Sequence, residues 1–128
     1  NLSDRCDIQQ SDWFQSVSGR FDLITCNPPY ISEPEMRGLS RDVLDWEPHL
    51  ALTPGGDGLS SYRQIADHLA RHLSPGGRAL FEIGPTQASA VASILSRAGL
   101  HQGTVHKDLD GRDRVVSVQL PENMRDCG

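Results

Sequence analysis

The chain has 128 residues, of which 37% are hydrophobic and 23% are charged, and its formal net charge is -5. This length and composition suit one globular domain with a buried core. The acidic balance disfavours nonspecific binding to nucleic acid, because such binding depends on clustered Lys and Arg side chains that neutralise phosphates. No apolar run approaches the roughly 20 residues of a membrane span, and no signal-peptide pattern opens the chain. We therefore expect a cytoplasmic protein with no membrane association and no direct nucleic-acid binding.

The cysteines and histidines predict neither a disulfide framework nor a metal site. Cys6, Cys26 and Cys127 are odd in number and widely spaced, which favours a reducing compartment. His68 and His72 stand four residues apart on a predicted helix, the spacing found in one metalloprotease motif. No glutamate follows His68 and no third ligand is evident, so we predict no metal.

In the first part of the chain, local pattern predicts a strand that leads into a loop. Residues 1–5 resemble the end of a helix, residues 6–9 a short strand, and residues 11–14 a polar-to-aromatic loop. Residues 21–26 are apolar, rich in β-formers and followed by two prolines. This pattern predicts a buried strand of a parallel sheet. Residues 31–58 contain many Pro and Gly residues and predict a long irregular segment that contributes to substrate binding.

The second part of the chain predicts alternating helices and strands. Apolar residues at helical spacing predict helices over residues 59–73 and 87–98, with Gly99 as the cap of the second helix. A strand is expected at residues 78–83, after the break formed by residues 74–77. The Asp110-Gly111 pair predicts the turn of a closing antiparallel hairpin, with strands at residues 104–107 and 114–120. Residues 121–128 are expected to form a loose tail.

The loop after residues 21–26 is the strongest functional signal. It consists of Asn27, Pro28, Pro29 and Tyr30 and is here called the NPPY loop. Ligands of open α/β sheets bind beyond the carboxyl ends of strands, where Asn27 stands. The prolines keep the loop extended, so the Asn27 side-chain oxygen and the Pro28 carbonyl can accept both N–H bonds of a planar NH2 group. We predict methyl transfer to a planar nitrogen, with the Tyr30 ring as an apolar cover.

Each of these residues also has a purely structural interpretation. The NPPY loop would then be a Pro-Pro turn, with Tyr30 as a packing residue. Ser11 or Asp12 would cap a short helix and Trp13 would be a core anchor. Glu82, at the end of a predicted central strand, would pair with Arg112 or Arg114 rather than act in catalysis.

Several motifs beside the NPPY loop carry a resemblance to a known family. They are Asp12-Trp13, Glu47-Pro48, Ala51-Leu52, Asp57-Gly58-Leu59, Tyr62-Arg63, Ile65, Glu82-Ile83-Gly84, Gln87, Asp108, Gly111 and Arg114. With these residues the chain resembles, over nearly its whole length, the C-terminal part of the release factor glutamine methyltransferases, the PrmC/HemK family. The combination, more than the loop alone, points to this family.

The resemblance implies transfer of a methyl group from S-adenosylmethionine to the glutamine side-chain amide in the Gly-Gly-Gln motif of class I peptide-chain release factors. It implies an α/β fold of the Rossmann-like class I methyltransferase type, with a C-terminal antiparallel hairpin. Residues 1–120 would be the C-terminal part of the catalytic domain. By matching positions, the NPPY loop binds the substrate glutamine, and Asp12, Trp13 and Asn27 contact the cofactor.

The chain departs from the family pattern at its beginning. The glycine-rich loop after the family's first strand, and the acidic residue that ends the second, have no counterpart in this sequence. We therefore expect an N-terminally truncated domain without its first two strands, and a sheet with a gap near its centre. Three alternatives stay open: methylation of a ribosomal-protein glutamine, methylation of an exocyclic base amine, and an inactive fragment.

Overall fold

A computed structural model describes residues 2–39 and 41–122 of the chain. The elements over these residues are strands and helices, and the strand at residues 21–26, the two longer helices and the closing hairpin were predicted from the sequence. In chain order they are β1 Phe21–Cys26, α1 Glu33–Met36, α2 Arg41–Trp46, α3 His49–Leu52, α4 Ser60–His72, β2 Leu73–Glu82, α5 Ala88–Arg97, β3 His101–Lys107 and β4 Asp113–Gln119. None of these helices is long and apolar enough to cross a membrane.

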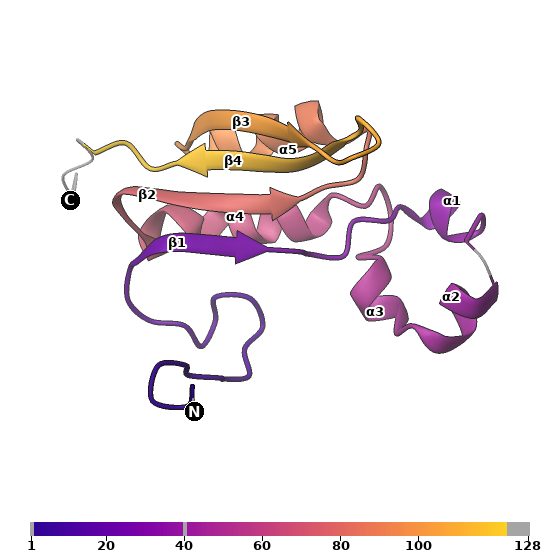
Figure 1. The fold of residues 1–128 in the computed structure, drawn as a ribbon, viewed down its shortest axis with the longest axis horizontal. Helices are drawn as coiled ribbons and strands as arrows, with labels where there is room; N and C mark the ends of the chain where they lie inside the picture. The colour runs from indigo at the N-terminus through magenta and orange to yellow at the C-terminus, as the bar shows by residue number, and fades with distance from the viewer. Residues whose placement is uncertain (1, 40, 123–128) are drawn as a thin grey trace.

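The four strands form one sheet in the order β1-β2-β4-β3 (Figure 1). β1 and β2 run parallel, so their carboxyl ends lie at the same edge of the sheet. β4 is antiparallel to β2 and to β3, and β3 and β4 form the predicted hairpin with Gly111 at φ +80° in its turn. The three short helices gather beyond the carboxyl end of β1 (Figure 1).

The hydrophobic core lies between the sheet and the two long helices, which are on the same side of it (Figure 1). α4 contributes Tyr62 and Leu69, which are fully buried, and β2 contributes Phe81. Because side chains alternate along a strand, Leu80 and Glu82 of β2 face the opposite side and are only half-buried. The sheet therefore has one packed face and one face that is open among the described residues.

The strand predicted at residues 6–9 is absent. Residues 3–5 form a turn in which the Arg5 N–H donates to the Leu2 carbonyl at 2.9 Å, and residues 6–10 have no regular structure. A strand needs a neighbour with which to exchange hydrogen bonds, and no described strand pairs with this segment. The gap expected within the sheet is also absent from the described residues, because the four strands are contiguous.

The position of β1 was predicted correctly, but its burial was not. Leu23 is 60% exposed and Phe21 is 41% exposed. A strand is buried on both faces only when it has neighbours on each side and cover above and below. Among the described residues β1 pairs with β2 alone, so it stands at an edge of the sheet.

Two other parts of the structure differ from the predictions: the segment 31–58 and the start of β2. The segment 31–58 is less irregular than expected, because it contains the three short helices. The first of these begins with a capping box in which Ser32 and Glu35 satisfy each other's backbone N–H groups. β2 begins at Leu73, directly after α4, and not at residue 78 as predicted. Its pairing with β1 is irregular between Leu73 and Arg78, where the register shifts. Of the predicted tail, residues 123–128 lie outside the described residues.

Candidate functional site

The NPPY loop leaves the carboxyl end of β1, as predicted. Pro28 is fully buried and anchors the loop, whereas Asn27 is exposed. Neither the Asn27 side chain nor the Pro28 carbonyl forms a hydrogen bond with any described residue. The acceptors that the sequence analysis assigned to a substrate amide are thus unpaired in this part of the chain.

Gln87, the residue just before α5, holds the last residue of the loop. Its side-chain nitrogen donates to the Tyr30 carbonyl at 2.9 Å, and its side-chain oxygen accepts from the Gly84 N–H at 2.8 Å. Gln87 is 9% exposed; its bond to Gly84 is buried and its bond to Tyr30 is partly buried. Because Gly84 lies two residues after the end of β2, the Gln87 amide joins the NPPY loop to the segment that leaves this strand.

Gly58 lets a second segment approach the same backbone. It has φ +79°, and a Cβ atom at this position would collide with the Tyr30 carbonyl oxygen and lie 3.0 Å from the Ser32 nitrogen. Only glycine combines this left-handed conformation with so close a contact. Gly58 stands just before α4, so the beginning of that helix is packed against the NPPY loop.

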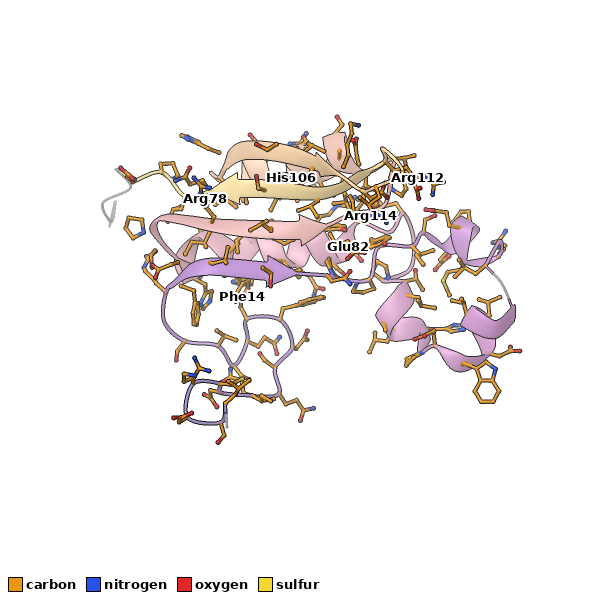
Figure 2. The ribbon with its side chains drawn as sticks, viewed as in Figure 1. Phe14, Arg78, Glu82, His106, Arg112 and Arg114 are labelled. Atoms are coloured by element: carbon orange, nitrogen blue, oxygen red, sulfur yellow. The ribbon has the colours of Figure 1, made fainter. Side chains whose placement is uncertain are left out.

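The Tyr30 hydroxyl is fixed by charged groups from two strands. It donates to Oε1 of Glu82 at 3.1 Å and accepts from Nη1 of Arg114 at 3.3 Å. Figure 2 shows Glu82 and Arg114 at the same end of the sheet. The predicted Glu82–arginine pair is not formed among the described residues, because Tyr30 lies between the two groups and Arg114 pairs with Asp108 at 3.1 Å.

The phenols of Tyr30 and Tyr62 and the thiol of Cys26 stay neutral over the physiological range. Burial raises the pKa of Tyr30, and the neighbouring Glu82 carboxylate raises it further, while Arg114 opposes this effect. Burial also raises the pKa of Tyr62, whose hydroxyl donates to the Glu82 carbonyl at 2.6 Å. Burial raises the pKa of the Cys26 thiol to about 11. The two phenols and the thiol around the loop are therefore uncharged.

A hollow of about 330 Å³ opens beside the loop at the carboxyl ends of β1 and β2. It is lined by Thr25, Cys26, Asn27, Leu80, Glu82 and Val115. Most of these side chains belong to the open face of the sheet, and more of the lining is apolar than polar. This is the position at which parallel sheets bind ligands, and we refer to it as the Asn27 hollow.

Asp12 and Trp13 line a different hollow, also of about 330 Å³, against the second half of α4. The two linings share no residue, so the described structure does not bring Asp12 and Trp13 together with Asn27. Trp13 has φ +50°, and the Ser11 hydroxyl donates to its carbonyl at 2.8 Å. Phe14 lies beneath β1, away from Glu82 (Figure 2), and stacks on the His72 ring at 4.4 Å.

Several residues that shape the site had no assigned role from sequence. Gln87, Gly58 and Asp108 carried the family resemblance, but nothing in their local sequence indicated that they act on Tyr30. Arg63 pairs at the surface with Asp57 at 2.5 Å. Among the described residues, no group of three or more His, Cys, Asp and Glu side chains could hold a metal ion.

Comparison with known proteins gives several strong matches. The chain is 54% identical over 120 residues to the release factor glutamine methyltransferase of Cereibacter sphaeroides, covering 94% of this chain and 43% of that protein. It is 41% identical to the release factor glutamine methyltransferase of Clostridium acetobutylicum, covering 91% of this chain and 42% of that protein. A bifunctional methyltransferase of Rickettsia typhi is 37% identical, covering 92% and 23% respectively.

The fold has a counterpart among solved structures. A methyltransferase from Pyrococcus furiosus superposes with a TM-score of 0.56 at 14% identity, covering 82% of this chain and 43% of that chain. Together with the mixed sheet, this places the chain in the α/β, Rossmann-like class I methyltransferase fold. No family model matches the sequence. The chain spans less than half the length of the curated relatives named above. With these relatives, the chain belongs to the PrmC/HemK family of release factor glutamine methyltransferases, of which it represents a C-terminal part.

Proposed function

We propose that this chain holds the glutamine amide during methyl transfer from S-adenosylmethionine to the Gly-Gly-Gln motif of class I peptide-chain release factors. The observation that carries the proposal is the unpaired, exposed Asn27 side chain beside the Asn27 hollow, on a loop whose backbone is held by Gln87 and Gly58. Two relatives are named release factor glutamine methyltransferases, which favours this substrate class.

The chemistry of an amide explains why the holding residues matter. Its nitrogen lone pair is delocalised and attacks a methyl donor poorly, so orientation supplies much of the acceleration. The Asn27 side-chain oxygen and the Pro28 carbonyl accept the two N–H bonds and fix the plane of the NH2 group. The Tyr30 ring belongs to the same loop and keeps water from one side of the reacting pair.

The described residues fit one end of the cofactor better than the whole of it. Bound S-adenosylmethionine supplies an electrophilic methyl group on a sulfonium. The Asn27 hollow, at about 330 Å³, is near the small end of the range of roughly 300 to 1,000 Å³ typical of ligand pockets. It suits a glutamine amide with the reacting end of a cofactor. Asp12 and Trp13 remain proposed adenine contacts, since a carboxylate accepts from the exocyclic amine and an indole flanks the ring.

The first experiment is a calorimetric titration of S-adenosylmethionine into the chain, followed by a methyl-transfer assay with a release factor. Saturable micromolar binding and methylation of the Gly-Gly-Gln glutamine would support the proposal. A release factor in which that glutamine is replaced should accept no label. Labelling of the replaced factor, or only of nucleic acid or a ribosomal protein, would contradict the assigned substrate. No binding by this chain would place the activity in a longer polypeptide.

A matched pair of variants tests the amide-holding role. Asn27→Ala should lower methyl transfer at least about tenfold and leave cofactor affinity within a few-fold, because one oriented acceptor is typically worth about 1 to 3 kcal/mol. Asp22→Ala changes another exposed polar residue, within β1, the strand that leads into this loop, and should leave both quantities unchanged. Equal turnover by the Asn27 variant and the unmodified protein would exclude the amide-holding role.

A further inference from the structure

We infer that Arg114 is a positioning residue that acts through the Tyr30 hydroxyl and is itself aimed by Asp108 in the hairpin turn. The inference rests on the proposed function in one respect, since the group being positioned is the ring beside the substrate amide. The contacts themselves are independent of any activity. They join residues that are 84 positions apart in the chain.

The hairpin turn fixes Asp108 first. Its Oδ1 accepts from the backbone N–H groups of Asp110 at 2.9 Å and Arg112 at 3.0 Å. Its backbone N–H donates to the Arg112 carbonyl at 2.8 Å. These bonds close the turn around the carboxylate and leave the second oxygen, Oδ2, directed at Arg114. The orientation of that oxygen is thus set by the turn, not by the arginine.

Asp108 then fixes the arginine. Oδ2 accepts from Nε of Arg114 at 3.3 Å and from Nη2 at 3.1 Å, which uses one edge of the planar guanidinium. A guanidinium presents its donors in a rigid fork, so fixing one edge also fixes the direction of the remaining donors. Nη1 is directed at the Tyr30 hydroxyl, 3.3 Å away. A lysine in this position could not hold both partners in a fixed geometry.

The tyrosine ring transmits this position to the loop. Its hydroxyl is held between Arg114 and Glu82, and its edge faces Gly84, where an added Cβ atom would lie 3.4 Å from the ring. The Tyr30 carbonyl is held by Gln87. Without Arg114 the hydroxyl keeps only the Glu82 contact, so the ring is held less firmly. Arg114 is not among the residues that line the Asn27 hollow, so it acts on the NPPY loop through Tyr30.

Tyrosine ionisation tests the contact without any assay of activity. The chain has two tyrosines, and Tyr62 is the more deeply buried of them, so a sample labelled at the tyrosine Cζ atoms gives two separable NMR signals. The groups facing Tyr30 are Glu82 from β2 and Arg114 from β4, with Tyr62 from α4 behind it and Cys26 from β1 beside Tyr62. The Arg114 charge lowers the pKa of Tyr30, so removing it should raise that pKa.

Three variants give the expected pattern. Arg114→Ala should raise the pKa of Tyr30, and Arg114→Lys should raise it less, because the charge remains. Arg112→Ala is the control, since the Arg112 guanidinium is exposed and forms no hydrogen bond with the described residues; it should leave the Tyr30 titration unchanged. An unchanged titration in both Arg114 variants would overturn the inference.

Kinetics of methyl transfer test whether the position of Tyr30 affects the reaction. They are measured in the natural protein that contains this sequence. Arg114→Ala should lower kcat/KM about tenfold, the loss expected for one charge-assisted hydrogen bond, with partial recovery in Arg114→Lys. Cofactor affinity should not change. In a Tyr30→Phe background, Arg114→Ala should cause no further loss, because its route of action is already gone. A further tenfold loss there would overturn the inference. If the unmodified protein transfers no methyl group, the proposed function fails and the tyrosine titration alone decides this inference.

Discussion

Replacing Gly58 by alanine should destabilise the protein much more than the same change two residues earlier. Both Gly58 and Gly56 have positive φ angles, of +79° and +55°. Alanine therefore costs about 1 to 2 kcal/mol at either position for the left-handed conformation alone. Nothing lies within 4 Å of a Cβ atom at Gly56, whereas a Cβ atom at Gly58 collides with the Tyr30 carbonyl oxygen. The partner is backbone that Gln87 also holds, so it cannot simply rotate away.

The expected difference follows from these contacts. We expect Gly56→Ala to cost about 1 kcal/mol of unfolding free energy and Gly58→Ala to cost about 3 kcal/mol or more, since overpacking typically adds 1 to 3 kcal/mol. Urea unfolding followed by far-UV circular dichroism measures both values under one set of conditions. Equal costs for the two variants would refute the close packing of the segment before α4 against the NPPY loop.

Three further changes test other parts of the site. Gln87→Leu should cost about 2 to 4 kcal/mol of unfolding free energy, because it leaves a backbone N–H and a carbonyl without partners in a buried position; urea unfolding measures it. Tyr62→Phe should cost about 1 to 2 kcal/mol by the same measurement, since it removes the bond to the Glu82 carbonyl. Hydrogen bonds lower the pKa of Asp108 below its usual 3.8. The ionised Asp108 carboxylate therefore supports the turn fully above pH 3.8, and this support is lost as the pH falls through the lowered pKa. Amide hydrogen exchange at Arg112 should become faster in that lower pH range, while exchange in β2 stays slow.

The regular elements were predictable where local sequence decides them. Residues 21–26 combine β-forming side chains with an abrupt stop at two prolines, and the structure has a strand at the same residues. α4 follows from apolar residues at helical spacing, which become its buried face. The hairpin turn follows from Asp110-Gly111, because a glycine accepts the positive φ that the turn requires.

Burial and pairing were not predictable in the same way. The apolar composition of β1 indicates a strand with neighbours on both sides, but its exposure depends on which strands are beside it. Residues 6–9 have some β-forming character, yet a strand exists only where a partner supplies hydrogen bonds. The short helices of the segment 31–58 are below the length at which apolar periodicity gives a signal.

The site shows the same division between local and distant information. The sequence located Asn27 and the direction of the loop, because both depend on adjacent residues. It did not reveal that Tyr30 contacts Glu82, Gln87 and Arg114, which lie 52, 57 and 84 positions away. Only the sheet order brings these side chains to one edge, since β2 stands between β1 and β4.

The two prolines explain why the loop needs these distant residues. Proline has no N–H group, so Pro28 and Pro29 cannot donate hydrogen bonds that would hold the loop to its surroundings. The loop is held instead at Tyr30. The Gln87 amide donates to the Tyr30 carbonyl, the Arg114 guanidinium donates to the Tyr30 hydroxyl, and that hydroxyl donates to Glu82. Both donors bind Tyr30, so the Asn27 side chain and the Pro28 carbonyl stay unpaired among the described residues. A loop held at its last residue by donors from outside can keep its first two acceptors oriented and available to an amide.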